Sequence, residues 1–372
     1  MSLFQIDAGT EWRGGQRQAL FLARELKRNG FRFTFVVQPD SPLHQKAGEE
    51  GLPVLPLRMK SEMDVLASLR LAGAMKREGC VLAHFHDAHA VAVGGRAARR
   101  ARVPIRIISR RVDFPLKRNP FSRSKYAKNV DLIIAISEGV KAVLIKGGIA
   151  PAAIEVIPSG IDFSPFDAVK GRDFLREEFR FSPEDYLVGI VAALEDHKGH
   201  QYLLEAARLI KLRAPKIKIV IVGTGSLDLE LDQQARELQV DDLVFFLGFR
   251  EDVPRILASL DLFVLSSKLE GLGSSLMDAM ASRLPVVATE VGGIPEVVVK
   301  NETGFLVPPR DPVRLADAII RLYQDRSLAA RFGKRGYEVV HEKFSAEAMA
   351  RRIIAVYENI ALKKGITLRP QK

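Results

Sequence analysis

Short apolar runs recur along the whole chain and alternate with segments whose apolar residues are spaced as in a helix. The runs are continuous rather than alternating, which is typical of strands buried on both faces of a parallel sheet. One helical segment, residues 16–28, is ended by Gly30. The predicted strands are residues 3–6, 33–37, 54–57, 81–85, 105–108, 132–136, 154–157, 187–194, 218–222, 243–247, 262–265, 285–288 and 305–307.

The repeated strand–helix units predict an α/β protein with two doubly wound open sheets. The rhythm breaks after residues 158–162, and Pro165, Gly171 and Pro183 then punctuate a polar stretch. This places a domain boundary within residues 163–183, and 372 residues are enough for two cores. The two halves are alike in pattern only, because no close sequence repetition relates them.

Ligands of such sheets lie beyond the carboxyl ends of the strands, so the loops there hold the candidate chemistry. Residues 270–285 run from a strand through a glycine turn into a helix expected to begin at Ser274 or Ser275. The first amide groups of that helix form an anion site, and Glu270 and Asp278 straddle it. The arrangement suits a ligand with phosphates at one end and hydroxyls at the other, although a solvated carboxylate pair is the alternative.

Other loops of the second half have similar character. Lys198 opens a helix and is a candidate for holding a diphosphate, with a solvated lysine as the alternative. The pair Gly223 and Gly225 lacks the later glycine of a dinucleotide fingerprint. Phe249 and Arg250 end another strand, where backbone groups could meet a flat base. Several such loops at successive strand ends predict a nucleotide-sugar site.

Two loops of the first half are also candidates. Gly14 and Gly15 precede a helix and either let a ligand approach the backbone or form a tight turn. Arg110, Arg111 and Asp113 follow a strand, where the arginines could grip a phosphate or carboxylate of an acceptor.

A histidine-rich loop follows the predicted strand 81–85. His84 and His86 share one face of the strand, whereas His89 belongs to the following helix, and Asp87 lies between them. No further metal ligand is obvious, so we favour an interdomain polar site over plain packing, and both over metal binding.

The net charge of +11 lies entirely in the first half. Residues 1–165 hold 26 Lys and Arg against 15 Asp and Glu, whereas residues 166–372 hold 30 of each. Such a field attracts polyanions or an anionic membrane surface, and we expect residues 117–128 to seat against the membrane. The alternatives are a solvated basic face without a dedicated partner and a non-catalytic binder of polyanions or nucleic acid.

The sequence also limits the cellular context. The single cysteine, Cys80, excludes an intrachain disulfide and a cysteine-rich metal site. No apolar run of about 18 residues occurs, and the N-terminus has no basic leader with a long apolar core, so we expect neither a membrane span nor a secretion signal. The expected location is cytoplasmic, with peripheral attachment to the inner membrane face.

From Gly14 to about Tyr357 the chain resembles the retaining family 4 ("group 1") glycosyltransferases of the GT-B fold, including the lipopolysaccharide-core type. The second half carries the more specific motifs, in the family's order: Lys198-Gly199, Gly223-Thr224-Gly225, residues 270–278, 284–289, 292–296 and 304–307. The first half matches less distinctively, at Gly14-Gly15, the histidine loop, Ser137-Glu138 and residues 157–162.

The resemblance implies two Rossmann-like domains that face each other across a cleft. The first domain, residues 1–164, would bind the acceptor, and the second, residues 165–345, would bind an activated sugar donor. Residues 346–372 would form a last helix that crosses back to the first domain, followed by a tail.

The resemblance also implies roles for particular residues. Glu270 and Lys198 would be catalytic, with Glu270 contacting the donor sugar and Lys198 the diphosphate, while Asp278 would contact the ribose. The predicted donor-binding residues are Gly14, Gly15, Phe249, Arg250, Gly271, Leu272, Gly273, Ser274, Ser275, Leu276 and Asp278. The predicted acceptor-side residues are His86, Asp87, His89, Arg110, Arg111 and Asp113.

Two sites depart from the family pattern. The family usually has glutamate where Asp278 stands, and an arginine shortly before the phosphate lysine, where this chain has Ala192 and Ala193. Some relatives have a histidine after the strand that here ends in Ser109, Arg110 and Arg111, so no catalytic histidine is assigned there.

The expected activity is retaining transfer of a sugar, of the hexosyltransferase type, from a nucleoside diphosphate sugar, most simply a UDP-sugar, to a hydroxyl of a glycolipid or saccharide. No cofactor and no metal are expected, because no Asp-x-Asp motif occurs, and no nucleic-acid partner is expected. The alternatives are a non-catalytic polyanion binder that keeps the fold, and a sugar-nucleotide epimerase or phosphorylase.

Overall fold

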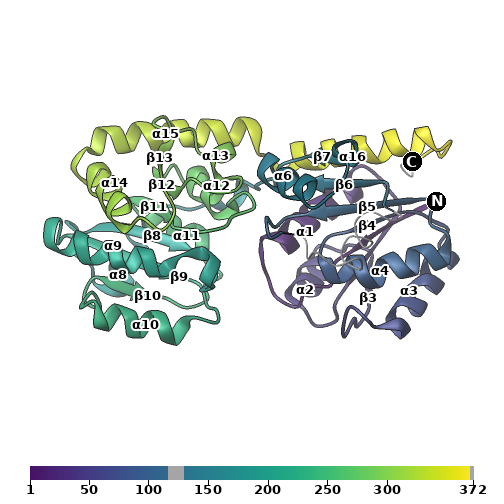
Figure 1. Ribbon diagram of the computed structural model, residues 1–372, viewed down its shortest axis with the longest axis horizontal. Coiled ribbons are helices and arrows are strands. Elements are labelled where there is room, and N and C mark those ends of the chain that lie inside the picture. Colours follow the sequence, from purple (N-terminus) through teal and green to yellow (C-terminus); the bar gives the residue numbers. More distant parts are fainter. Residues whose placement is uncertain (116–129, 369–372) are drawn as a thin grey trace. The chain divides into compact units, whose positions relative to one another are not determined.

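The computed structural model describes residues 1–115 and 130–368, which form two units (Figure 1). The first unit comprises Met1–Gly160 and Ala346–Lys372, and the second comprises Ile161–Ser345. The division falls at Gly160, slightly before the predicted boundary at residue 164. The predicted membrane segment 117–128 lies outside the described residues.

The first unit contains a parallel sheet of seven strands in the order β3-β2-β1-β4-β5-β6-β7. Each predicted strand of this half is present and differs from the prediction by at most two residues at an end. The strands are β1 (Ser2–Ile6), β2 (Phe33–Val37), β3 (Val54–Pro56), β4 (Cys80–Phe85), β5 (Ile105–Arg110), β6 (Leu132–Ala135) and β7 (Ile154–Val156).

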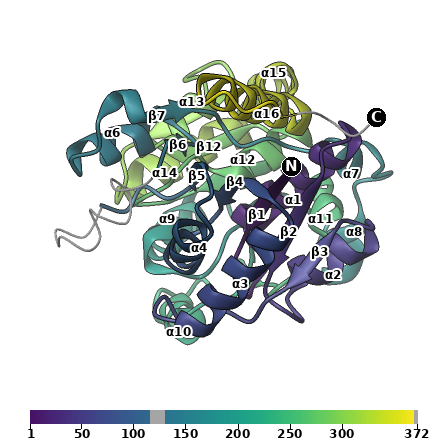
Figure 2. The same ribbon diagram turned by 90° about the vertical axis from the view of Figure 1, so that its right-hand side faces the viewer.

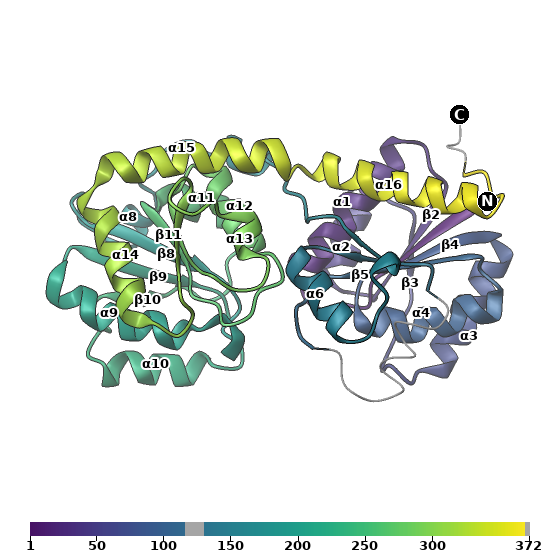
Figure 3. The same cartoon turned by 45° about the horizontal axis from the view of Figure 1, so that its top comes forward.

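The helices of the first unit include the last helix of the chain. Helix α16 packs beside α1 (Figure 3), and its apolar residues Met349, Ile353 and Tyr357 join Leu20 and Leu22 in one core cluster. The helices are α1 (Gly14–Arg28), α2 (Pro42–Glu49), α3 (Val65–Arg77), α4 (Ala88–Ala101), α6 (Glu138–Lys146) and α16 (Ala346–Lys363), with a short 3-10 turn at Pro151–Ala153.

The second unit contains a parallel sheet of six strands in the order β10-β9-β8-β11-β12-β13. The strands are β8 (Tyr186–Val191), β9 (Ile217–Val222), β10 (Val244–Phe246), β11 (Leu262–Leu265), β12 (Val286–Thr289) and β13 (Gly304–Val307). The helices are α7 (Ser164–Asp167), α8 (Phe174–Phe179), α9 (His200–Arg213), α10 (Asp228–Glu237), α11 (Val253–Ser259), α12 (Ser274–Ala281), α13 (Ile294–Val297), α14 (Pro312–Gln324) and α15 (Arg326–Lys343), with a 3-10 turn at Asp196–Lys198.

Each sheet reverses its strand order at one place. In the first sheet the reversal falls between β1 and β4, and in the second between β8 and β11. In doubly wound sheets the crevice at this reversal, beyond the carboxyl ends of the strands, is where ligands bind. The predicted α/β class with two Rossmann-like sheets is therefore confirmed, and the fold marks one position in each unit for a functional site.

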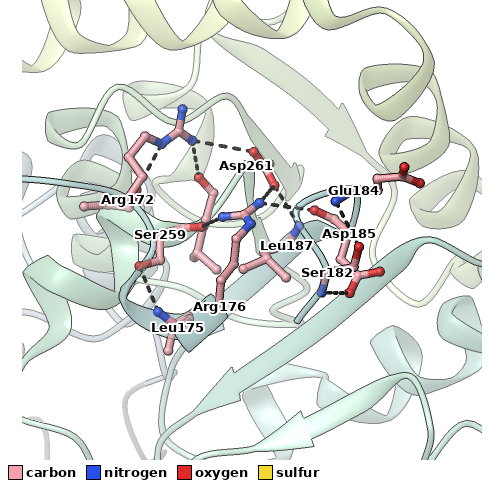
Figure 4. Close-up of polar contacts among 11 residues, drawn as sticks. Arg172, Leu175, Arg176, Ser182, Glu184, Asp185, Leu187, Ser259 and Asp261 are labelled. Carbon is pink, nitrogen blue, oxygen red and sulfur yellow. Dashed lines mark hydrogen bonds and ion pairs between the residues drawn. The ribbon is translucent and has the colours of Figure 1, made fainter. Parts of the chain in front are cut away.

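The polar segment after the domain boundary is fixed to the second sheet at the amino ends of its strands, opposite the carboxyl ends where ligands bind (Figure 4). The guanidinium of Arg176 donates to the Ser259 carbonyl at 3.2 Å and to the Asp261 carboxylate at 3.1 Å. Arg172 lies 3.6 Å from the same carboxylate, which also accepts from the Leu187 amide at 2.9 Å. Since Leu187 and Asp261 lie at the amino ends of β8 and β11, this cluster attaches α8 to the edge away from the candidate site.

Within residues 1–115 and 130–368, no helix combines the length and apolar character needed to cross a bilayer.

Candidate functional site

The loops after β8 and β11 bring Lys198 and Glu270 together at the strand-order reversal of the second sheet. The Lys198 ammonium group and the Glu270 carboxylate form an ion pair, and Ser267 Oγ donates to the same carboxylate at 3.2 Å. The side chains are 19% and 12% exposed, so the pair is largely shielded from bulk water while remaining reachable. The structure thus joins the two residues that the sequence assigned to the sugar and the diphosphate.

Close backbone packing explains why these two loops meet. Gly199 has a left-handed φ of 68°, and a Cβ there would lie 2.2 Å from the carbonyl oxygen of Ser266. The Ser266 hydroxyl donates to the Lys198 carbonyl at 3.2 Å, and Lys268 Nζ pairs with Asp196 at 2.5 Å. Glycine is therefore required at position 199 for the loop bearing Lys198 to lie against the loop bearing Glu270.

The N-terminus of α12 supplies backbone donors next to this pair. Gly273, at φ 85°, precedes the helix, which begins at Ser274 as predicted. The Leu276 amide donates to the Gly273 carbonyl at 3.0 Å, which leaves the amides of Ser274 and Ser275 as the better anion donors of this turn. The side chains of Leu272 and Leu276 are buried, so only their backbone groups could contact a ligand.

The remaining predicted donor residues of this unit occupy different environments. Gly271 is buried, and Asp278 lies on α12 and is 6% exposed. Phe249 is 58% exposed after β10, two strands away from β8 in the sheet. Arg250 is held by Glu178 at 2.7 Å and Asp252 at 2.8 Å, and these hydrogen bonds raise its pKa above the ordinary value.

In the first unit, two carboxylates meet at the strand-order reversal. Asp7 follows β1, and its carboxylate accepts from the Gly9 amide at 2.8 Å and from Gln16 Nε2 at 3.0 Å. Asp87 follows β4 and accepts from the Ala8 amide at 2.6 Å. Burial, followed by the charge of Asp87, raises the pKa of Asp7 to about 6. Asp7 was not among the predicted site residues, although its place directly after the first strand of a doubly wound sheet could have indicated it.

Arg111 supplies the positive charge of this site. Its guanidinium donates to the His86 carbonyl at 3.0 Å and to His86 Nδ1 at 3.1 Å. Burial lowers the pKa of Arg111 to about 10, and the charges of Asp7 and Asp87 oppose that shift. Gly15 lies against it, since a Cβ on that residue would be 3.7 Å from the Arg111 side chain. The structure thus gathers four predicted residues, Gly15, His86, Asp87 and Arg111.

A hydrogen-bond chain runs from Arg111 into the interior. Because a guanidinium can only donate, His86 Nδ1 accepts, and His86 Nε2 then donates to Gln5 Oε1 at 2.5 Å. The Gln5 amide group donates to the Tyr357 hydroxyl at 2.9 Å. Tyr357 lies on α16, so the last helix of the chain takes part in the site of the first unit.

The chain continues through His84. The Tyr357 hydroxyl contacts His84 Nδ1 at 2.5 Å, and His84 Nε2 contacts Ser109 Oγ at 2.8 Å. Every ring nitrogen of His84 and His86 is therefore engaged within the protein, and burial holds the pKa of both rings well below the ordinary value. In the part of the chain that the structure describes, no group of three or more His, Cys, Asp or Glu side chains could hold a metal ion.

The other predicted acceptor-side residues lie around this site. His89 is half-buried in the first turn of α4, and its amide donates to Asp87 at 2.8 Å. Arg110 ends β5 and donates to the Phe114 carbonyl at 2.6 Å, and Asp113 is buried.

Comparisons with known proteins identify the family and the fold. The family model "Glycosyl transferases group 1" matches residues 171–339, and "Glycosyltransferase Family 4" matches residues 12–164. The structure of Anabaena Alr3699/HepE in complex with UDP and glucose aligns with a TM-score of 0.85 at 21% identity, over 96% of this chain and 100% of that one. The chain belongs to the GT-B glycosyltransferases.

Relatives of this GT-B glycosyltransferase differ in what they act on. N-acetyl-alpha-D-glucosaminyl L-malate synthase of Bacillus anthracis is 33% identical over 50% of this chain and 48% of its own length. A GDP-mannose-dependent alpha-(1-6)-phosphatidylinositol monomannoside mannosyltransferase of Mycobacterium tuberculosis is 30% identical over 63% of this chain and 64% of its own length. The chain spans about half the length of the curated relatives it matches.

The raised pKa of Asp7 predicts a particular pH dependence of stability. Because the pKa of about 6 in the folded protein exceeds the ordinary aspartate value of 3.8, ionisation of Asp7 opposes folding. The stability of the natural protein relative to the Asp7→Asn variant should therefore fall by about 2–3 kcal/mol as pH rises from about 4 to 6, and stay level above that. Urea unfolding of both proteins across this range measures it, and a difference that does not change with pH would contradict it.

The hydrogen-bond chain predicts that Tyr357→Phe is destabilising. The variant leaves a buried Gln5 amide and a buried His84 nitrogen without their partner, at a cost of about 1–3 kcal/mol in the free energy of unfolding. Tyr323→Phe is the matched control, since no described residue forms a hydrogen bond with the Tyr323 hydroxyl. Equal denaturation midpoints for the two variants would show that the chain contributes no net stability.

Proposed function

We propose that the protein is a retaining glycosyltransferase that moves a sugar from a nucleoside diphosphate sugar, of the UDP type, to a hydroxyl of a glycolipid or saccharide. The observation that carries this proposal is the Lys198–Glu270 ion pair at the reversal between β8 and β11. A cation, a carboxylate and the first amides of α12 are gathered there within one pair of loops. These are the groups that an anionic diphosphate and a hydroxyl-bearing sugar require.

Each group has a distinct part in the proposed reaction. Glu270 accepts hydrogen bonds from sugar hydroxyls, and the amides of Ser274 and Ser275 donate to phosphate oxygens. A bound diphosphate competes with Glu270 for the ammonium group of Lys198, which then faces the charge of the leaving group. Such preorganised donors act where charge accumulates in the transition state.

The proposed displacement occurs on one face of the sugar. The bond from the anomeric carbon to the donor phosphate breaks while the bond to the acceptor oxygen forms. The departing phosphate oxygen takes the acceptor proton, so this route needs neither a protein nucleophile nor a bound metal.

The compared proteins support a nucleotide-sugar donor but differ in the base. The aligned Anabaena protein is described in complex with UDP and glucose, and the mycobacterial relative is described as GDP-mannose-dependent. We favour uridine, and a thermal-shift screen of UDP- and GDP-sugars tests this. At 100 times its dissociation constant, a donor should stabilise the fold by about 2.7 kcal/mol. Stabilisation by GDP-sugars alone would overturn the UDP assignment.

The charge of the first half favours an anionic acceptor. Residues 1–165 hold 26 basic residues against 15 acidic ones, and the mycobacterial relative is named for a phosphatidylinositol lipid substrate. We therefore propose an anionic glycolipid acceptor of the lipopolysaccharide or cell-envelope type at a membrane surface.

Removal of the Lys198 charge should slow transfer strongly. We expect Lys198→Ala to reduce the rate of nucleotide release from the donor by about 10²–10³, the loss seen when one oxyanion donor is removed. Lys211→Ala is the control, because Lys211 lies in the last turn of α9, whereas Lys198 directly precedes the first turn, and Lys211 forms an ion pair with Asp242. Unchanged turnover in Lys198→Ala would sink the role of the lysine.

The alternatives give different products. A polyanion binder releases no nucleotide from any donor. An epimerase forms product without an acceptor, and a phosphorylase depends on free phosphate.

A further inference from the structure

Four large apolar side chains are exposed within seven residues of the first unit. Met63, Val65, Leu66 and Leu69 have exposed fractions of 68%, 60%, 59% and 42%. They lie in the loop before α3 and in its first turns, and together they are called the α3 patch. Contiguous exposed apolar residues of this kind mark an interaction surface, whereas single exposed apolar residues need no explanation.

The α3 patch is a consequence of how α3 packs. The helix lies beside α4 (Figure 2) and turns Ala67, Leu71 and Met75 inward. Leu69 is a neighbour of both Leu66 and Val65 on the outer face, because residues three and four apart lie side by side on a helix. The inward face of α3 already packs against α4. The exposed apolar residues on the outer face therefore do not contribute to the core of this unit.

Hydrogen bonds hold the patch in a fixed shape. Arg96 of α4 donates to the Glu62 carbonyl at 2.6 Å and to Ser68 Oγ at 3.3 Å. The Asp64 carboxylate caps α3 by accepting from the Ala67 amide at 2.9 Å. A patch that is ordered before it meets a partner loses less conformational entropy on binding.

Basic side chains outnumber acidic ones in the sequence next to the apolar residues, where the acids are Glu62 and Asp64. Arg58, Lys60 and Arg70 are all exposed. The Lys60 amide donates to the Asp64 carboxylate at 3.1 Å, and Arg70 lies in the second turn of α3, so both basic residues belong to the start of this helix. An apolar centre with a net positive flank is complementary to an anionic bilayer, whose acyl boundary is apolar and whose headgroups are negative.

The patch lies at the same edge of the sheet as the site of the first unit. Helix α3 follows β3, so its first turn is near the carboxyl edge. Gln38 Nε2 donates to the Met59 carbonyl at 2.8 Å, and Gln38 Oε1 accepts from the Met59 amide at 3.1 Å. Gln38 also reaches the Ala8 carbonyl at 3.4 Å, in the loop that follows Asp7. The loop before α3 is thus tied to the loop that carries a residue of the site.

We propose that the α3 patch inserts into the headgroup boundary of an anionic bilayer and sets the carboxyl edge of the first sheet against the membrane. The proposal gives the lipid-acceptor part of the proposed function a physical docking surface. Insertion itself does not depend on which sugar is transferred. The proposed membrane-contacting surface is therefore the α3 patch, which is separate in sequence from the segment 117–128.

Vesicle binding tests the proposal with a matched pair of variants. The double variant Leu66→Ser, Leu69→Ser removes apolar side chains from the patch, and Leu212→Ser, Leu229→Ser removes two that are 79% and 83% exposed in the second unit. Sedimentation is measured with phosphatidylcholine vesicles, with and without phosphatidylglycerol. We expect the natural protein and the control to bind the anionic vesicles, and the patch variant to bind at least about tenfold more weakly.

A fluorescent probe tests insertion directly. An environment-sensitive thiol label on Leu66→Cys should shift to the blue with anionic vesicles, whereas the same label on Leu229→Cys should not. Cys80 is buried, and burial raises its pKa to about 12, so it should not compete for the label.

Several results would overturn the proposal. Two of them are equal vesicle binding by the two double variants and no blue shift of the label at position 66. The third is self-association of the natural protein that the patch variant abolishes, which would assign the surface to a second copy of the chain. Stabilisation by donor sugars without vesicles is measured in parallel. If the patch variant loses vesicle binding but is still stabilised by a donor sugar, both proposals are supported. If vesicle binding depends on the patch but no donor sugar stabilises the protein, only the proposed transferase function is wrong.

Discussion

The reversal of strand order in each sheet is the constraint on which the rest of the structure depends. Parallel strands joined by right-handed crossovers must place their helices on opposite faces on either side of the reversal. The loops after β1 and β4, and those after β8 and β11, are therefore left uncovered at the carboxyl edge. Asp7 and Asp87 meet at the first of these positions, and Lys198 and Glu270 at the second.

The buried and half-buried carboxylates after β1 and β4 require a nearby positive charge and hydrogen-bond partners. This requirement brings Tyr357, near the C-terminus of the chain, into the site of the first unit. The Arg111 cation lies among Asp7, Asp87 and His86, and the direction of the hydrogen bonds that start from it is fixed because a guanidinium cannot accept. Tyr357 completes the path to His84. Helix α16 therefore does more than cover the core, because it contributes a polar group without which the site would leave buried donors unpaired.

The sequence predicted the strands, the helix that begins at Ser274 and the residues Lys198 and Glu270, because continuous apolar runs and glycine turns are local signals. It did not predict Gln5 or Tyr357, since periodicity identifies strands and helices but not which of them are neighbours. A glutamine inside a fully buried strand was nevertheless a usable signal, because buried polar groups need partners. For Arg250, the sequence could not show that Glu178 and Asp252 would hold its charge.

The uneven charge of the two halves and the α3 patch act over different distances. Residues 166–372 are electrically balanced, so the long-range attraction to an anionic surface comes from the first half alone. That attraction is screened beyond about 8–10 Å at physiological salt and cannot by itself fix an orientation. Apolar insertion acts only at contact, but it distinguishes one face of the unit from the others. A basic field that brings the protein to the surface and an apolar patch that orients it are each weak alone, and stable attachment to a membrane commonly needs two such signals.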